Sequence, residues 1–390
     1  MVRREHIGYL LAVLMDGAVM ATTFFAVTRR AAEREASAAD LGWLGAVFFI
    51  VYAVAVPFTG RVADRFGRRR LMVAGLLTTG LFILASAYEV RFGMLLALSA
   101  LVGVGAAMFW PAVIAWLCEG RSGKGLVGVL SAFSICWNLG LFIGSSTGGV
   151  LYSLKETLPF WVFGGALVVA PLLLFVPHKM TLAGKEEAPS NISRPTALYH
   201  LRLAWLANLT VLLGLGAVSA MFPQLATRLD ISPAMHGNLI ATSRAAAIVA
   251  FLVMWSTTAW QHRIWPLLVI SIVGGAGALM VAMGTHNGWF FAGFGAMGFA
   301  SGVGYLTSTF YTLEAFAGRA AGVGWNEAVL GVGLFVGPLA AGFVGQAWGL
   351  RAPYFFAAAL FAAGLLAQTG LAFVTRPGYK ARVKMRMTEP

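Results

Sequence analysis

Twelve apolar runs of about 20 residues recur along the chain and constrain its fold more than any other feature. Each run is long enough for an α-helix to cross about 30 Å of hydrocarbon, because a helix rises about 1.5 Å per residue. Hydrophobic residues make up 59% of the chain and charged residues only 11%. The sequence therefore predicts an all-α integral membrane protein with twelve transmembrane helices and excludes a water-soluble domain. The runs cover residues 7–28, 41–60, 71–88, 92–117, 125–153, 158–177, 200–226, 233–258, 264–284, 288–313, 320–347 and 352–375.

The net charge of +13 raises the possibility of a nucleic-acid partner, so the placement of the basic residues has to decide. If the N-terminus is cytoplasmic, 20 of the 28 Lys and Arg residues fall in cytoplasmic segments and seven on the opposite side, with Arg244 inside a helix. This bias follows the positive-inside rule. We therefore expect a multi-pass protein of the bacterial inner or plasma membrane with both termini in the cytoplasm, and no nucleic-acid partner.

The longest polar stretch between apolar runs extends from Pro177 to Leu198 and divides the chain into halves of six runs each. Offsetting the halves by about 195 residues aligns Gly103 with Gly298 and Glu119 with Glu314, which favours an internal repeat. Parallel repeats of this kind place a substrate site near the membrane midplane. The predicted parts are an N-terminal six-helix bundle over 1–177, a cytoplasmic linker over 178–199, a C-terminal bundle over 200–377 and a basic cytoplasmic tail over 378–390.

A dense charged segment, residues 60–70, lies between the second and third runs and reads as a cytoplasmic turn. It resembles the loop motif G-x-x-x-D-R-x-G-R-[RK] of the major facilitator superfamily, a resemblance that extends over the chain in helix number, loop lengths and orientation. The resemblance implies two six-helix bundles related by a pseudo-twofold repeat, and transport by alternating access. It also implies a conformational latch in which Asp64 approaches the start of the eleventh helix. Alternatively, the basic residues only hold the turn in the cytoplasm. The latch residues are Gly60, Asp64, Arg65, Gly67 and Arg68.

Glycines spaced four apart mark the fifth and eleventh runs and predict close helix packing. The fifth run is similar to a G-x-x-x-G-P-x-x-G-G motif of exporters in the family, with Ser145 in place of the proline. In those exporters this face is thought to bend the helix and seal one side of the pathway. The fourth run has Ser99 where proton-coupled exporters usually carry an arginine. The predicted packing residues are Gly140, Gly144, Gly148, Gly149, Gly333, Gly337 and Pro338.

Three charged residues lie at membrane depth, where a charge is costly unless it is paired or hydrated. Asp16, Arg244 and Glu327 each lie about 10–17 Å from the surface at which their run begins. Arg244 and Glu327 form a structural ion pair, or Arg244 binds an anionic substrate group or alternately releases Glu327 during the transport cycle. Asp16 is a proton-titrating carboxylate, a substrate ligand or a locally hydrogen-bonded residue.

Aromatic and amide side chains at similar depth predict a mixed pocket for an amphipathic organic molecule. Together with the three charges, the expected pathway residues are Tyr52, Trp110, Asn138, Tyr305 and Asn326. The six histidines are scattered, so we expect no metal, no cofactor and no enzymatic activity. We predict a monomeric secondary transporter of a small organic solute, with efflux in exchange for protons as the first expectation. Uptake of an organic anion or other metabolite bound through Arg244, by symport or uniport, is the alternative.

Overall fold

The computed structural model describes residues 4–118, 123–175, 194–316 and 320–375. Twelve α-helices occupy these ranges and correspond one to one with the twelve predicted runs, which confirms the all-α membrane fold. A short 3₁₀ helix, η1 (Ala170–Phe175), continues α6. The helices are α1 (Arg4–Glu33), α2 (Ala38–Phe66), α3 (Arg68–Ala85), α4 (Phe92–Cys118), α5 (Gly123–Leu154), α6 (Leu158–Val169), α7 (Arg194–Arg228), α8 (Pro233–Ser256), α9 (Trp265–Met283), α10 (Asn287–Ala315), α11 (Ala320–Trp348) and α12 (Ala352–Thr375).

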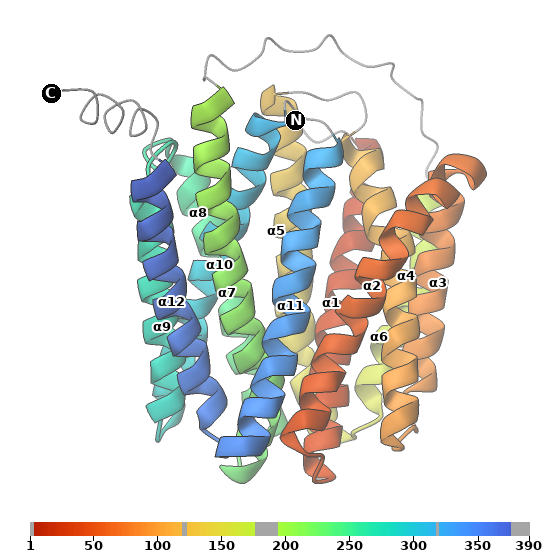
Figure 1. Cartoon of the computed structure of the whole chain (residues 1–390). Helices are drawn as coiled ribbons and strands as arrows, with labels where there is room; N and C mark the ends of the chain where they lie inside the picture. The colour runs from red at the N-terminus through yellow and green to blue at the C-terminus, as the bar shows by residue number, and fades with distance from the viewer. Residues whose placement is uncertain (1–3, 119–122, 176–193, 317–319, 376–390) are drawn as a thin grey trace, which may run out of the picture.

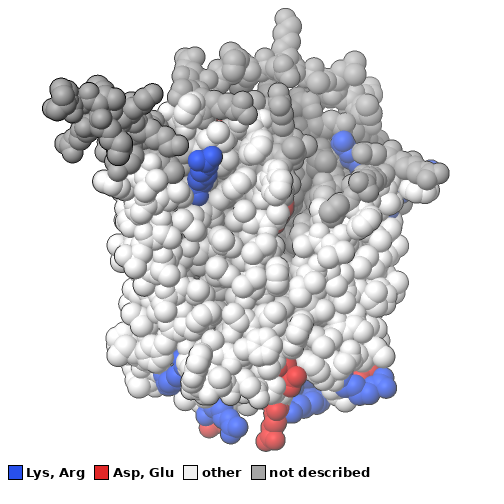
Figure 2. Space-filling view, in the orientation of Figure 1, with Lys and Arg blue, Asp and Glu red and all other residues white. Residues whose placement is uncertain are grey.

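The surface of the molecule has the charge distribution that a bilayer requires. Charged side chains gather at the two ends of the helices, and the band between them is almost uncharged in the view of Figure 2. Within the described ranges, nine helices are long and apolar enough to cross a membrane, and Leu158–Leu174 forms a shorter apolar segment. The start of α1 and the end of α12 lie on the same face, at the top of Figure 1.

The charged segment at residues 60–70 is not the extended turn that the sequence suggested. Helix α2 continues to Phe66 and α3 starts at Arg68, so Gly67 alone separates them. Gly67 has a φ of 91°, a conformation that glycine adopts without the steric cost of a side chain. The helix continues because residues 61–66 contain no glycine or proline, and Arg and Ala are good helix formers. The side chains of Asp64 and Arg65 lie outside the described part, so the latch stays a prediction.

Helix α7 also differs from its predicted start. It begins at Arg194, inside the segment 178–199 that we expected to be linker. Pro195 is its second residue, and proline is tolerated in a first turn because its missing N–H would have no helical partner there. The polar stretch before the second half is therefore shorter than predicted.

The helices form two bundles, α1–α6 and α7–α12, which stand side by side in Figure 1. Inside the first bundle α1 packs against α5 and α3 against α4; inside the second, α7 packs against α11 and α9 against α10. Across the bundles, α5 packs against α8 and α2 against α11. The same pairs of helices are therefore used in both halves, as expected for a repeated unit.

Glycines bring the helices of each bundle into backbone contact. A Cβ atom at Gly144 of α5 would lie 2.1 Å from the carbonyl oxygen of Ala18 in α1, far inside contact distance. The hydroxyl of Thr22 donates to the carbonyl of Gly144 at 3.1 Å across the same interface. In the second bundle, a Cβ at Gly337 of α11 would lie 2.3 Å from the carbonyl of Leu213 in α7. Small residues thus allow the helix backbones to approach more closely than larger side chains would permit.

The two bundles touch at the ends of the helices that lie farthest from the termini. There Gly149 of α5 meets the first turn of α8, where an added Cβ would lie 2.6 Å from the carbonyl of Pro233. The Ser146 hydroxyl donates to Asn238 at 2.7 Å, and Arg29 Nη1 donates to the carbonyl of Ile231 at 3.0 Å. On this side the space between the bundles is closed.

Candidate functional site

A cavity of about 260 Å³ lies between the two bundles. Its described lining comes from α1, α2, α4 and α5 of the first bundle and from α7, α8, α10 and α11 of the second. Helices α3, α6, α9 and α12 contribute no residue to the lining within the described ranges. The third helix and the last helix of each bundle therefore lie away from the cavity.

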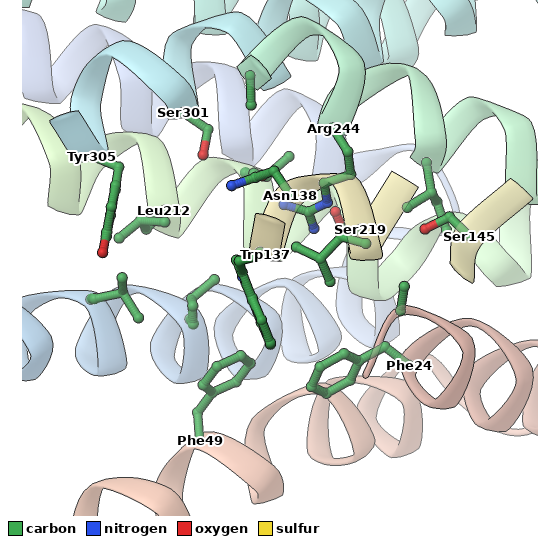
Figure 3. Close-up of a pocket in the computed structure, with 18 of the residues that line it drawn as sticks. Phe24, Phe49, Trp137, Asn138, Ser145, Leu212, Ser219, Arg244, Ser301 and Tyr305 are labelled. Carbon is green, nitrogen blue, oxygen red and sulfur yellow. The ribbon is translucent and has the colours of Figure 1, made fainter. Parts of the chain in front are cut away.

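One end of the cavity is polar and contains a cation. Arg244 of α8 extends into the cavity toward Asn138 of α5 and Ser219 of α7 (Figure 3). Asn138 uses its amide N–H to donate to the carbonyl of Ser134 at 2.9 Å. Arg244 Nε has no hydrogen-bond partner within the described residues, and no ion pair there joins Arg244 to Glu327. In this structure the two side chains line the same cavity without bridging it, and a pair that forms in another state of the transport cycle stays a prediction.

The rest of the lining is mostly apolar and rich in aromatic rings. Trp110 and Trp137 meet edge to face with ring centroids 4.8 Å apart, and Trp137 points toward Phe49 in Figure 3. An aromatic wall of this kind favours a ring or another apolar body, through stacked and edge contacts. The aromatic residues that line the cavity are Phe24, Phe25, Phe49, Trp110, Phe133, Trp137, Phe251 and Tyr305.

Asp16 lies next to the cavity but does not line it. Its side chain is fully buried in α1, and its Oδ2 accepts a hydrogen bond from Trp110 Nε1 at 2.7 Å. Its other carboxylate oxygen, Oδ1, has no partner among the described residues. Asp16 is therefore connected to the cavity through the indole of Trp110.

Glu327 of α11 lines the cavity in the second bundle. Tyr52 of α2 is 4% exposed and does not line the cavity. Its ring packs against Trp110, with centroids 5.0 Å apart. Tyr52 therefore supports the cavity wall through its contact with Trp110.

Asn326 is turned away from the cavity. It is buried, accepts a hydrogen bond from the Ser308 hydroxyl and donates to Thr309 at 3.5 Å. Its polar groups therefore connect α11 to α10. Of the eight residues predicted for the pathway, five line the cavity: Arg244, Glu327, Trp110, Asn138 and Tyr305.

Several lining residues were not predicted from the sequence. Ser219, Ser301 and Ser145 add hydroxyl groups, and the phenylalanines form much of the wall. Ser145 did carry a signal, because it replaces the proline of the glycine motif, and its buried Oγ has no partner among the described residues. The phenylalanines carried none, since the chain has 28 of them.

Two six-helix bundles around a central cavity define a membrane transporter. The family model described as Major Facilitator Superfamily matches residues 9–206 and again 204–388. The chain therefore belongs to the major facilitator superfamily and is a transporter, not an enzyme. The repeated match agrees with the two bundles.

The relatives of this chain are named for different transport activities. A 3-(3-hydroxy-phenyl)propionate transporter of Escherichia coli is 28% identical over 317 residues, covering 78% of this chain and 77% of that protein. The multidrug resistance protein MdtG of Proteus mirabilis is 26% identical over 338 residues, covering 82% and 83%. The quinolone resistance protein NorA of Staphylococcus aureus is 22% identical over 357 residues, covering 84% and 86%.

A solved structure has the same fold. A bacterial homologue of the human lysosomal transporter Spinster, described as inward-facing and occupied, superposes with a TM-score of 0.72. It covers 96% of this chain and 97% of its own length, at 15% sequence identity. At this identity the likeness shows the fold alone.

Proposed function

We propose that this chain transports aromatic carboxylic acids by alternating access and binds the substrate carboxylate through Arg244. One observation carries the proposal: Arg244 lines the cavity and has no hydrogen-bond or ion-pair partner among the described residues. A charge at membrane depth costs several kcal/mol unless it is paired or hydrated. A substrate carboxylate in the cavity would supply the missing partner, and a guanidinium can bind it with two parallel hydrogen bonds.

The remaining lining supports an aromatic body for the same substrate. The rings of Phe49, Trp137 and Tyr305 surround the space beside Arg244 (Figure 3). An anionic group at one end and an aromatic wall around the rest match an arylalkanoate better than a sugar or an inorganic anion. The relative named as a 3-(3-hydroxy-phenyl)propionate transporter agrees with this substrate class.

We further propose that the structure is an inward-facing state. The excess of Lys and Arg on the side of the termini supports a cytoplasmic location for both of them. The bundles contact each other on the opposite face, through Gly149 and the first turn of α8. The cavity would therefore exchange substrate with the cytoplasm.

Proton coupling is proposed for the two membrane-buried carboxylates. Asp16 hydrogen-bonds only to Trp110 among the described residues, and Glu327 has no basic partner there. Carboxylates in such positions mark proton pathways in many transporters. The multidrug relatives favour the second candidate, which is efflux of amphipathic compounds in exchange for protons through the same carboxylates.

Three structural roles complete the proposal. The residues Gly60, Asp64, Arg65, Gly67 and Arg68 would form the cytoplasmic latch that closes when the chain faces outward. The glycines of α5 and α11 would serve as the packing faces on which the bundles are built. The division into bundles would fall between α6 and α7, with residues 378–390 as a cytoplasmic tail.

The test of the substrate class is an Arg244→Gln variant, which keeps much of the side-chain length and removes the charge. We expect it to bind 3-phenylpropionate about 10–150-fold more weakly, since hydrogen bonds to charged groups contribute about 1.5–3 kcal/mol. Binding of the neutral alcohol 3-phenylpropanol should be unchanged. Isothermal titration of the purified protein measures both ligands.

Arg202→Gln is the matched control, because Arg202 is exposed on α7 and outside the cavity lining. It should leave both affinities at their wild-type values. Equal loss of acid and alcohol binding in Arg244→Gln would contradict a role for the charge. Proteoliposomes with the substrate inside or outside then decide between uptake and efflux.

A further inference from the structure

Trp110 contacts both the cavity and the buried carboxylate of Asp16. Its ring belongs to the cavity lining, and its Nε1 donates to Asp16 Oδ2 at 2.7 Å. The residue lies in α4, whereas Asp16 lies in α1. A single side chain therefore separates the buried carboxylate from the space that the substrate would occupy.

The indole is held in place by rings from three other positions. Its centroid lies 4.8 Å from that of Trp137, 5.0 Å from that of Tyr52 and 5.8 Å from that of Phe48. Trp137 itself lines the cavity and belongs to α5. Because Trp110 and Trp137 both line the cavity, a molecule that packs against the aromatic wall there would contact the indole or its neighbouring ring.

Asp16 has no other described access to the cavity. Its side chain is fully buried, and a Cβ at the next residue, Gly17, would lie 2.7 Å from the carbonyl oxygen of Trp137 in α5. Helices α1 and α5 are thus in backbone contact directly beside Asp16. The carboxylate meets one polar side chain, Trp110, and keeps one oxygen without a partner among the described residues.

Within the described residues, no charged side chain takes part in this environment. Helices α2, α4, α5, α6 and α7 and η1 pack against α1, and none of their described charged groups interacts with Asp16. On α4, α6 and η1 no described side chain is titratable. The titratable side chains described on the other packed helices are Asp40 and Tyr52 of α2, Cys136 and Tyr152 of α5, and Tyr199, His200, Arg202 and Arg228 of α7.

We infer that Trp110 is a positioning residue that makes proton exchange at Asp16 depend on substrate in the cavity. The inference rests on the proposed function, because it requires an aromatic substrate and a proton-carrying Asp16. With the cavity empty, the indole N–H holds Asp16 Oδ2 and the ring seals the carboxylate. A substrate ring that packs against Trp110 displaces the indole, the hydrogen bond breaks, and a proton passes between cavity water and an oxygen of Asp16.

The first experiment measures the seal without transport. Dicyclohexylcarbodiimide reacts with buried protonated carboxyl groups, and mass spectrometry of the purified chain quantifies the adduct on Asp16. In wild type we expect slow labelling that 3-phenylpropionate accelerates. Trp110→Phe keeps a ring but loses the N–H donor. It should label about tenfold faster without ligand and gain nothing from ligand.

The matched control is Trp205→Phe, which removes another indole hydrogen bond. Trp205 Nε1 donates to Thr312 Oγ1 at 2.9 Å in the second bundle, outside the cavity lining. This variant should label Asp16 at the wild-type rate. A general loosening of the fold by a lost indole bond would accelerate labelling in both variants, and that result would overturn the inference.

The second experiment separates coupling from binding in proteoliposomes. Trp110→Phe and Asp16→Asn should both lose accumulation of 3-phenylpropionate driven by a pH gradient, and this loss should exceed any loss of counterflow exchange, which needs no net proton transfer. The double variant should be no worse than either single variant, since residues that act together are not additive. Additive losses, or wild-type accumulation in Trp110→Phe, would overturn the inference.

These experiments distinguish failure of the proposed substrate class from failure of the proposed role of Trp110. If titration shows that the wild type does not bind 3-phenylpropionate, the substrate class is wrong, while the ligand-free labelling ratio still tests the seal. If the wild type binds this acid and the acid leaves the labelling of Asp16 unchanged, the role of Trp110 is overturned although the substrate class stands.

Discussion

A substitution at Gly149 should shift the conformational equilibrium between the inward-facing and outward-facing states. It lies on α5 where the first bundle contacts α8 of the second, on the closed side of the cavity. A Cβ at this position would lie 2.6 Å from the carbonyl oxygen of Pro233 and 3.1 Å from the Cα of Gly237. Gly149→Ala should therefore destabilise the closed contact specifically, because the new atom has no space until the bundles separate.

The magnitude follows from the missing space. Ordinary contact begins at 3.4 Å, so α5 and α8 must move apart by about 0.8 Å, an amount that packed side chains of one helix cannot absorb. Overpacking of this kind costs about 1–3 kcal/mol. We expect the population closed on this face to fall by about 5–150-fold relative to the open population.

The assay is a distance measurement across the closed face. Spin labels on cysteines introduced at Leu154 and Leu229, exposed positions beside the ends of α5 and α7, report the separation of the bundles by double electron–electron resonance. The native Cys118 and Cys136 are replaced by serine first. Gly149→Ala should shift the distance distribution toward longer distances.

Gly165→Ala is the matched control, because nothing lies within 4 Å of a Cβ at that position of α6. Both substitutions add the same methyl group and the same helix propensity, so the difference between them isolates the contact with α8. If the two variants give the same distance distribution, then the bundles do not depend on contact at Gly149 and the reasoning fails.

Two further predictions concern the charged segment between α2 and α3. Gly67→Ala should lower the thermal unfolding temperature by a few degrees, because a residue with a side chain is strained at a φ of 91°. A Cβ at Gly67 would meet no atom within 4 Å, so a steric contact does not account for the effect. Differential scanning fluorimetry measures the change against Gly93→Ala, where a Cβ also meets no neighbour, and equal unfolding temperatures would contradict the prediction. Asp64→Asn should slow transport in vesicles while the affinity for substrate stays within a few-fold. Lost binding with an intact conformational cycle would refute the latch.

Much of the fold could be predicted because the bilayer limits where apolar runs begin and end. The fourth run was expected at 92–117 and α4 spans Phe92–Cys118; the twelfth was expected at 352–375 and α12 spans Ala352–Thr375. The errors fall where helices leave the membrane. Hydropathy reports the buried part of a helix, so it missed the charged end of α2 and the first turns of α7.

The candidate site was harder to predict because the sequence gives depth but not direction. Counting along a helix placed Arg244, Glu327 and Asp16 near the middle of the membrane. The rotation of each helix was hidden, since lipid-facing and packed faces are both apolar and no polar stripe distinguishes them. Trp325 and Asn326 show the difficulty: the first is 61% exposed and the second is buried against α10.

The contacts that close the face opposite the termini also determine how the transporter should respond to its surroundings. Among the described residues, hydroxyls, an amide, small side chains and backbone groups make most of these contacts. The one cation among them, Arg29, donates to a neutral backbone carbonyl across the bundles, and its ion pair is with Glu33 of its own helix. Dissolved salt screens pairs of opposite charges but has little effect on such contacts. The equilibrium between the state closed on this face and the state open on it should therefore be nearly the same at low and at high ionic strength.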